Sequence, residues 1–167
     1  MRCSGPAGAI LPGMDDASIF GVVAGLPLHP LVVHGVVVLL PLMSLVTMLA
    51  AWRGWRQRVT WAVVAANAGV LALTLVARTS GQDLQAVQSV SDEVLDHARL
   101  GDVLPWFALG VLGVLAASVA VALLQRAPGR LRRFGLVLCV LAGAAAIWWT
   151  VRTGHSGAVA VWGDVLP

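Results

Sequence analysis

Four stretches of the sequence lack Asp, Glu, Lys and Arg over a length that suits a membrane-spanning helix, which needs about 20 apolar residues. They are residues 30–51, 59–77, 103–124 and 134–151. Over the whole chain 59% of residues are hydrophobic and 11% are charged, and the mean hydropathy is +0.87. A soluble domain carries about twice that charge. We therefore predict an all-α integral membrane four-helix bundle with helices at about these positions.

The N-terminal residues differ from the rest. Residues 1–25 are rich in Gly, Ala and Pro and lack the continuous apolar segment and cleavage site of a signal peptide. We expect them to form a disordered tail, with Met1 and Met14 as alternative starts, and residues 26–167 to form one four-helix transmembrane domain.

The charges predict an orientation. Two loops, "WRGWRQR" and "QRAPGRLRR", carry arginines and no carboxylate, whereas every Asp and Glu lies toward the opposite end of the predicted spans. Because cytoplasmic loops are enriched in Lys and Arg, we expect both loops inside and both termini and the middle loop outside. Anionic lipid at the inner face accounts for the formal net charge of +3, so we do not expect nucleic-acid binding.

All four histidines fall on the predicted outer side. We expect His29 just before the first span, His34 one turn inside it, His97 in the loop before the third span and His155 just beyond the fourth. The middle loop also contains a capping-box spacing from Ser89 to Asp92, which predicts a short helix. That helix would either lie on the membrane surface or extend the third span outward.

Three motifs resemble the DUF2231 family of predicted bacterial four-helix membrane proteins. They are "HPLVVHGVVVLLPL" at 29–42, "DHARLGD" at 96–102 and "RTGHSGAVAVWG" at 152–163, and the resemblance extends from Leu28 onward. One departure is Gly35 after the second histidine, with the proline delayed to Pro41. The resemblance implies a multi-pass protein of the bacterial inner membrane. Some members carry Rieske iron–sulfur domains, which implies electron transfer.

The first functional hypothesis is a b-type haem or a redox metal at the outer face, held by imidazoles from different helices for electron transfer. His34 and His155 form the preferred ligand pair, with His97 as a third ligand or gate and His29 as an orienting group. Arg78 or Arg152 would pair with haem propionates.

The second hypothesis is binding or transport of a divalent cation such as zinc or copper. Its ligands would come from His34, His97, His155, Asp96 and Asp102, with the carboxylates also able to orient an imidazole.

The third hypothesis needs no cofactor. The histidines would then cap helix ends and hydrogen-bond to loops in a structural or accessory subunit whose partner is another membrane protein. The partners expected of the chain more generally are a redox protein or a second copy of itself, and its Gly and Ala faces suit packing either within one chain or between two. The sequence contains no phosphate loop or nucleophile motif. This absence argues against an enzyme but leaves the question open.

Overall fold

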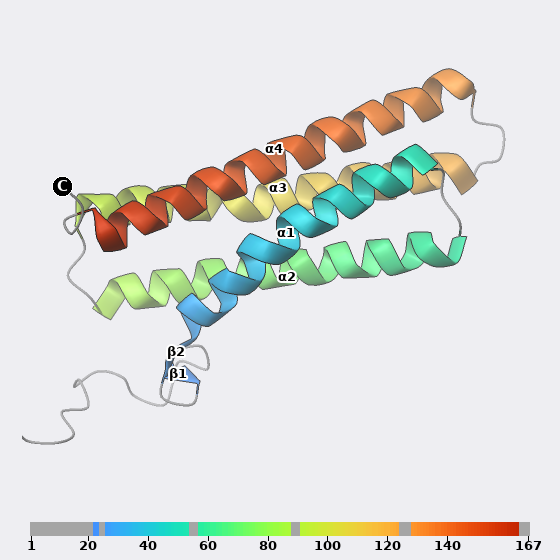
Figure 1. Cartoon of the computed structure of the whole chain (residues 1–167). Coiled ribbons are helices and arrows are strands. Elements are labelled where there is room, and N and C mark those ends of the chain that lie inside the picture. The colour runs from blue at the N-terminus through green and yellow to red at the C-terminus, as the bar shows by residue number, and fades with distance from the viewer. Residues whose placement is uncertain (1–21, 24–25, 54–56, 88–90, 124–127, 164–167) are drawn as a thin grey trace, which may run out of the picture.

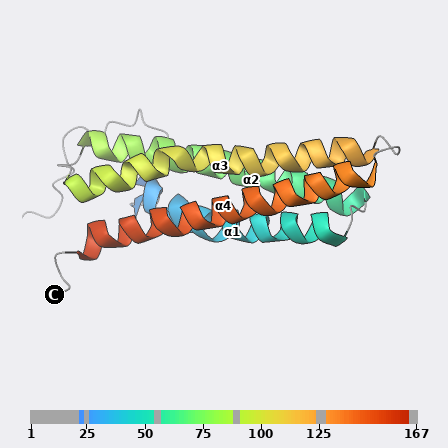
Figure 2. The same cartoon turned by 90° about the horizontal axis from the view of Figure 1, so that it is seen from above.

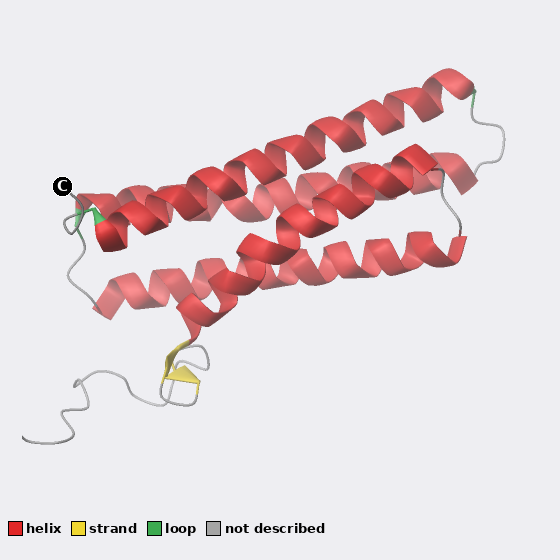
Figure 3. Ribbon diagram, viewed as in Figure 1, coloured by secondary structure: helices red, strands yellow, loops and turns green. Residues whose placement is uncertain are grey.

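The computed structural model describes residues 22–23, 26–53, 57–87, 91–123 and 128–163. This part of the chain forms four long helices and one short strand pair (Figure 1, Figure 3). The helices are α1 (Leu28–Arg53), α2 (Gln57–Val87), α3 (Asp92–Leu123) and α4 (Gly129–Trp162). The antiparallel strands β1 (Val22–Val23) and β2 (Leu26–Pro27) precede α1, with Val22 opposite Pro27.

The helices form two antiparallel hairpins, α1 with α2 and α3 with α4, which pack side by side (Figure 1, Figure 2). Each helix packs on two neighbours, and α1 and α3 lie diagonally opposite with few contacts. At one end, called the histidine end, α1 begins with His29 in its first turn and α3 begins with His97 in its second turn. At the other, called the arginine end, α1 finishes at Arg53 and α4 begins with Gly129 and Arg130.

The outer surface of the bundle is apolar. Each helix is long and apolar enough to cross a membrane, and large side chains such as Leu31, Val38 and Trp52 point outward and are exposed. An aqueous four-helix bundle would carry polar side chains at such positions, because solvated helix faces are polar. The chain is therefore a multi-pass membrane protein with four candidate spans.

Polar side chains lie inside the bundle and satisfy their hydrogen bonds locally. Ser44 Oγ donates to Leu40 O at 2.8 Å, and Thr150 Oγ1 donates to Ala146 O at 2.7 Å. Asn67 Nδ2 donates across the first hairpin to Thr47 Oγ1 at 3.1 Å. Lipid offers no partners to these groups, so bonds within or between helices are the way to bury them.

The helices extend beyond the predicted spans at the histidine end. The charge-free stretches stop at Arg78, Asp102 and Arg152, but α2, α3 and α4 continue through these residues. A charged side chain ends a span without ending a helix, because backbone hydrogen bonding continues outside the hydrocarbon. The predicted short helix is therefore the first part of α3, with Ser91 Oγ as the acceptor for Val94 N at 3.4 Å.

One predicted placement is wrong for this reason, because His155 lies within α4 and not beyond it. His97 lies on the part of α3 that extends the third span outward, which is one of the two alternatives predicted for the short helix of the middle loop. Of the tail predicted to be disordered, the structure describes only Val22–Val23, which form β1; residues 1–21 and 24–25 lie outside the described residues.

The second hairpin repeats the first. When His29 is aligned with His97 and Gly81 with Gly157, buried positions coincide in both helices of each hairpin. The coinciding buried pairs are Val36 and Leu104, Leu40 and Ala108, Thr47 and Leu115, Val63 and Cys139, Asn67 and Gly143, Val70 and Ala146, Thr74 and Thr150, and Ala77 and Thr153. Both hairpins enter the bundle from the histidine end, so an approximate twofold axis relates them along the bundle.

Candidate functional site

A cavity of about 310 Å³ lies at the histidine end between the four helices. Its walls include one histidine from each hairpin, His29 and His97, and three buried threonines, Thr74 from the first hairpin and Thr150 and Thr153 from the second. Most of the lining is apolar, with Arg78 and Asp102 as its charged members. Mostly apolar walls with a few convergent polar groups are typical of ligand sites, and the volume is at the lower end of their range.

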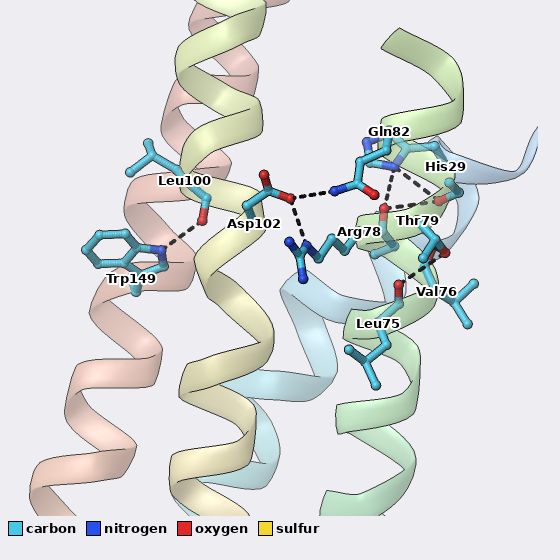
Figure 4. A network of polar contacts seen from close by, with 11 residues as sticks. His29, Leu75, Val76, Arg78, Thr79, Gln82, Leu100, Asp102 and Trp149 are labelled. Carbon is cyan, nitrogen blue, oxygen red and sulfur yellow. Dashed lines mark hydrogen bonds and ion pairs between the residues drawn. The ribbon is translucent and has the colours of Figure 1, made fainter. Parts of the chain in front are cut away.

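His29 is fixed to α2 by its Nδ1 atom. This atom lies 3.0 Å from Ala77 O and 3.3 Å from Ser80 Oγ (Figure 4). Ser80 Oγ donates its own proton to Ala77 O at 3.1 Å, so both groups act as acceptors toward the ring. Nδ1 of His29 therefore carries the hydrogen, and the neutral ring keeps an unshared electron pair on Nε2.

His97 is fixed to α4 in the same way. Its Nδ1 lies 3.1 Å from Thr153 O and 3.1 Å from Ser156 Oγ. Ser156 Oγ donates to Thr153 O at 2.8 Å, which again leaves two acceptors facing the ring. The neutral His97 ring is consequently also protonated on Nδ1 and unprotonated on Nε2.

A glycine of the partner helix supports each ring. A Cβ atom on Gly81 would lie 2.8 Å from Cε1 of His29, and a Cβ on Gly157 would lie 2.9 Å from Cε1 of His97. Only a residue without a side chain leaves room for the imidazole at these distances. We call each His–Ser–Gly group a histidine lock: His29, Ser80 and Gly81 in the first hairpin, and His97, Ser156 and Gly157 in the second.

The serines and glycines of the locks were not among the predicted site residues. A repeated sequence pattern could have identified them: a Ser–Gly pair follows Thr74 by six residues, and another follows Thr150 at the same spacing.

Charge is distributed unequally around the cavity. Arg78 Nε lies 2.9 Å from Asp102 Oδ1 and links α2 to α3, and Gln82 Nε2 donates to the same oxygen at 3.2 Å (Figure 4). In the repeat, Gly154 corresponds to Arg78 and His34 corresponds to Asp102. The interface between α4 and α1 therefore lacks this ion pair, since Gly154 has no side chain.

The aromatic side chains beside the cavity fix α4 against α3. Trp149 Nε1 donates to Leu100 O at 3.0 Å (Figure 4), and the Trp149 ring stacks on Phe107 with centroids 5.0 Å apart. Arg152, a predicted propionate partner, is exposed and has its guanidinium 5.6 Å from the Trp148 ring centroid and 5.7 Å from that of Trp149. These are cation–π distances.

The cavity brings together only some of the predicted site residues. His29, His97, Arg78 and Asp102 line it, whereas His34, His155, Asp96 and Arg152 do not. His34 is exposed and its Nδ1 bonds to Pro30 O of its own helix, and His155 is exposed on α4.

Both predicted carboxylate ligands pair with arginines. Asp96 contacts Arg99 at 3.0 Å, and Asp102 contacts Arg78. Within the described ranges, no three His, Cys, Asp or Glu side chains are grouped so that they could hold a metal ion. The ligand sets inferred from the sequence stay predictions.

Comparison with known proteins supports the family resemblance. Neither a curated protein nor a solved structure matches the chain. The family model described as "Predicted membrane protein (DUF2231)" matches residues 25–166, which include all four helices. The chain therefore belongs to the DUF2231 family of predicted membrane proteins.

Proposed function

We propose that the protein holds one redox-active metal centre, a copper ion or the iron of a b-type haem, between His29 and His97 at the histidine end. The observation that carries the proposal is the pair of histidine locks. Each lock uses Nδ1 for a bond to a backbone carbonyl and leaves Nε2 unprotonated on a ring that lines the shared cavity. Metal-binding histidines in proteins are oriented in this way.

The number and type of donor atoms at the site limit which metal centre it could hold. Neutral imidazole is a donor that both copper and haem iron accept, so His29 and His97 would hold either metal, and the bound metal would supply one-electron chemistry. Imidazole suits a Ca²⁺ or Mg²⁺ ion poorly, because those ions require oxygen ligands. The pairing of Asp96 and Asp102 with arginines further disfavours the cation-transport hypothesis.

The protein would contribute position and electrostatics. The locks fix the two rings, while the apolar wall lowers the local dielectric around the centre. The arginines at the opposite end favour a cytoplasmic arginine end, so we place the cavity on the outer side of the bacterial inner membrane. A redox partner would then dock at that face.

A second function is favoured by one specific observation: each lock joins the two helices of its hairpin. His29 connects α1 to α2 and His97 connects α3 to α4. The locks would then only hold the hairpins closed, in an accessory subunit without a cofactor.

Histidine variants separate the two functions. We would express the protein with added haem precursor or copper, purify it in mild detergent, and record oxidised and dithionite-reduced spectra together with copper and iron content. The test variants are His29→Gln and His97→Gln, and the matched controls are His34→Gln and His155→Gln, which change exposed rings outside the cavity.

The proposal predicts a bound metal in the wild-type protein that falls at least about tenfold in each test variant and remains in both controls. Wild-type protein without copper or haem after both loadings would favour the accessory-subunit function. Metal loss in the His34 and His155 variants alone would instead support the ligand pair preferred from the sequence.

A further inference from the structure

A second and larger hollow lies at the arginine end, far from the histidine locks. It has a volume of about 880 Å³ and is bounded by the last turn of α1, the second half of α3 and the first turns of α4. In Figure 1 the first turns of α4 diverge from the end of α1 at this end of the bundle. We call this hollow the basic groove.

Three arginines line the basic groove: Arg53 from α1, and Arg132 and Arg133 from α4. All three are exposed, and the ion pairs found within the described ranges involve Arg78 and Arg99 at the other end. The α4 N-terminus adds positive potential, since Pro128 precedes it without a side-chain cap. The mouth of the groove therefore favours an anion.

The α3 wall of the groove contains small residues. Gly113, Ala117 and Ala122 lie along it, and a Cβ on Gly113 would meet no atom within 4 Å. Leu131, Leu136 and Leu138 line the α4 side. A free phosphate or a nucleotide would leave this apolar wall unused, whereas an acyl chain would cover it.

Aromatic residues indicate the depth of the groove in the membrane. Trp52 and Phe134 line it, and their exposed fractions are 72% and 59%. Tryptophan side chains gather at the level of the lipid head groups, so Trp52 marks that level. The arginines beside them are therefore at the level of the phosphates, and the small residues lie at the level of the acyl chains.

We propose that the basic groove binds one anionic phospholipid, with its phosphodiester on Arg132, Arg133 and Arg53 and one acyl chain along the small residues of α3. Basic pockets between membrane helices recognise anionic head groups in this way. The bound lipid would fill the space between α1, α3 and α4 and hold the first turns of α4 in position.

The test is native mass spectrometry of the full-length protein in detergent, titrated with phosphatidylglycerol or phosphatidylcholine of identical acyl chains. The double variant Arg132→Gln/Arg133→Gln removes the head-group contacts. Its charge-matched control, Arg99→Gln/Arg152→Gln, removes two arginines that lie outside the groove. Gly113→Leu fills the acyl path, and Gly110→Leu is its control, since Gly110 is equally open on the same helix but does not line the groove.

We expect wild-type protein to retain one phosphatidylglycerol in preference to phosphatidylcholine. The arginine double variant should weaken retention about 30-fold, because each arginine near an anionic surface contributes about a factor of five. Gly113→Leu should weaken retention of both lipids, and the two control variants should bind as wild type does.

Three results would overturn the proposal. One is equal retention of the two lipids by wild-type protein, and another is unchanged retention in both the arginine variant and Gly113→Leu. The third is full displacement of the lipid by glycerol phosphate, which would show that the arginines bind a soluble phosphate without help from the apolar wall.

Discussion

The two hairpins carry the same histidine lock in different surroundings. In the first, His29 rests on Gly81 and bonds to Ala77 O; in the second, His97 rests on Gly157 and bonds to Thr153 O. The hairpins differ where they meet each other. Arg78 and Asp102 form an ion pair between α2 and α3, but the corresponding positions between α4 and α1 are Gly154 and His34.

The difference separates two roles at the histidine end. The lock is present in both hairpins, and in each it fixes one imidazole beside the cavity. The ion pair is present at one interface between the hairpins and absent from the other. It therefore affects the charge and the closure of the interface between α2 and α3, while the locks define the site.

The largest effect is expected from adding a methyl group to either lock. Gly81→Ala and Gly157→Ala would each place a Cβ within 3 Å of an imidazole carbon. We expect each to lower the free energy of unfolding in detergent by about 1–3 kcal/mol, because overpacking displaces the ring. Denaturant titration of the two variants checks whether the hairpins respond equally.

Gly154→Ala is the control for these variants, because a Cβ there would meet no atom within 4 Å. It should leave stability unchanged or raise it by about 0.5–1 kcal/mol, as Ala favours a helix over Gly. If Gly81→Ala behaved like Gly154→Ala, the first lock would not constrain its histidine.

A smaller effect is expected from the lock serines. Ser80→Ala and Ser156→Ala each remove one of two acceptors for Nδ1, and the ring keeps its bond to the carbonyl. We expect a loss of about 0.5–1.5 kcal/mol in each hairpin. Thr79→Ala removes hydroxyl bonds confined to its own helix and should cost less. A large difference between the two serine variants would argue against equivalent locks.

The smallest effect is expected from the ion pair. Arg78 and Asp102 have exposed side-chain fractions of 38% and 46%, so solvent screens their attraction. Arg78→Gln should lower stability by less than about 1 kcal/mol, and added salt should remove the difference. Measuring Asp102→Asn and the double variant alongside it tests whether the two side chains act as a pair. An effect as large as that of Gly81→Ala would make the asymmetry central to the fold.

The sequence was sufficient to predict the architecture because the apolar stretches are long and the charges lie between them. It failed on the helix ends, since Arg78, Asp102 and Arg152 end a hydropathy window without ending the helix. A comparison of the two halves of the sequence would have revealed the repeat.

The sequence was less informative about which histidines face the cavity. His29 and His34 are five positions apart, or about 140° around a helix, so they lie on different faces. Which face of α1 turns inward depends on how α1 packs on α2. The charge-free stretch carries apolar residues on every face, so it does not indicate which face is buried. The ligand pair preferred from the sequence therefore consisted of the two exposed histidines, His34 and His155.

The most direct test of the paired locks is ¹⁵N NMR of histidine-labelled protein in detergent, at a pH where the imidazoles are neutral. Spectra of His29→Gln and His97→Gln assign the two rings, and copper(I) or haem is then added. The account predicts that both rings carry hydrogen on Nδ1 and none on Nε2, and that the added centre shifts Nε2 of both. A ring unprotonated on Nδ1, or shifts confined to His34 and His155, would contradict it.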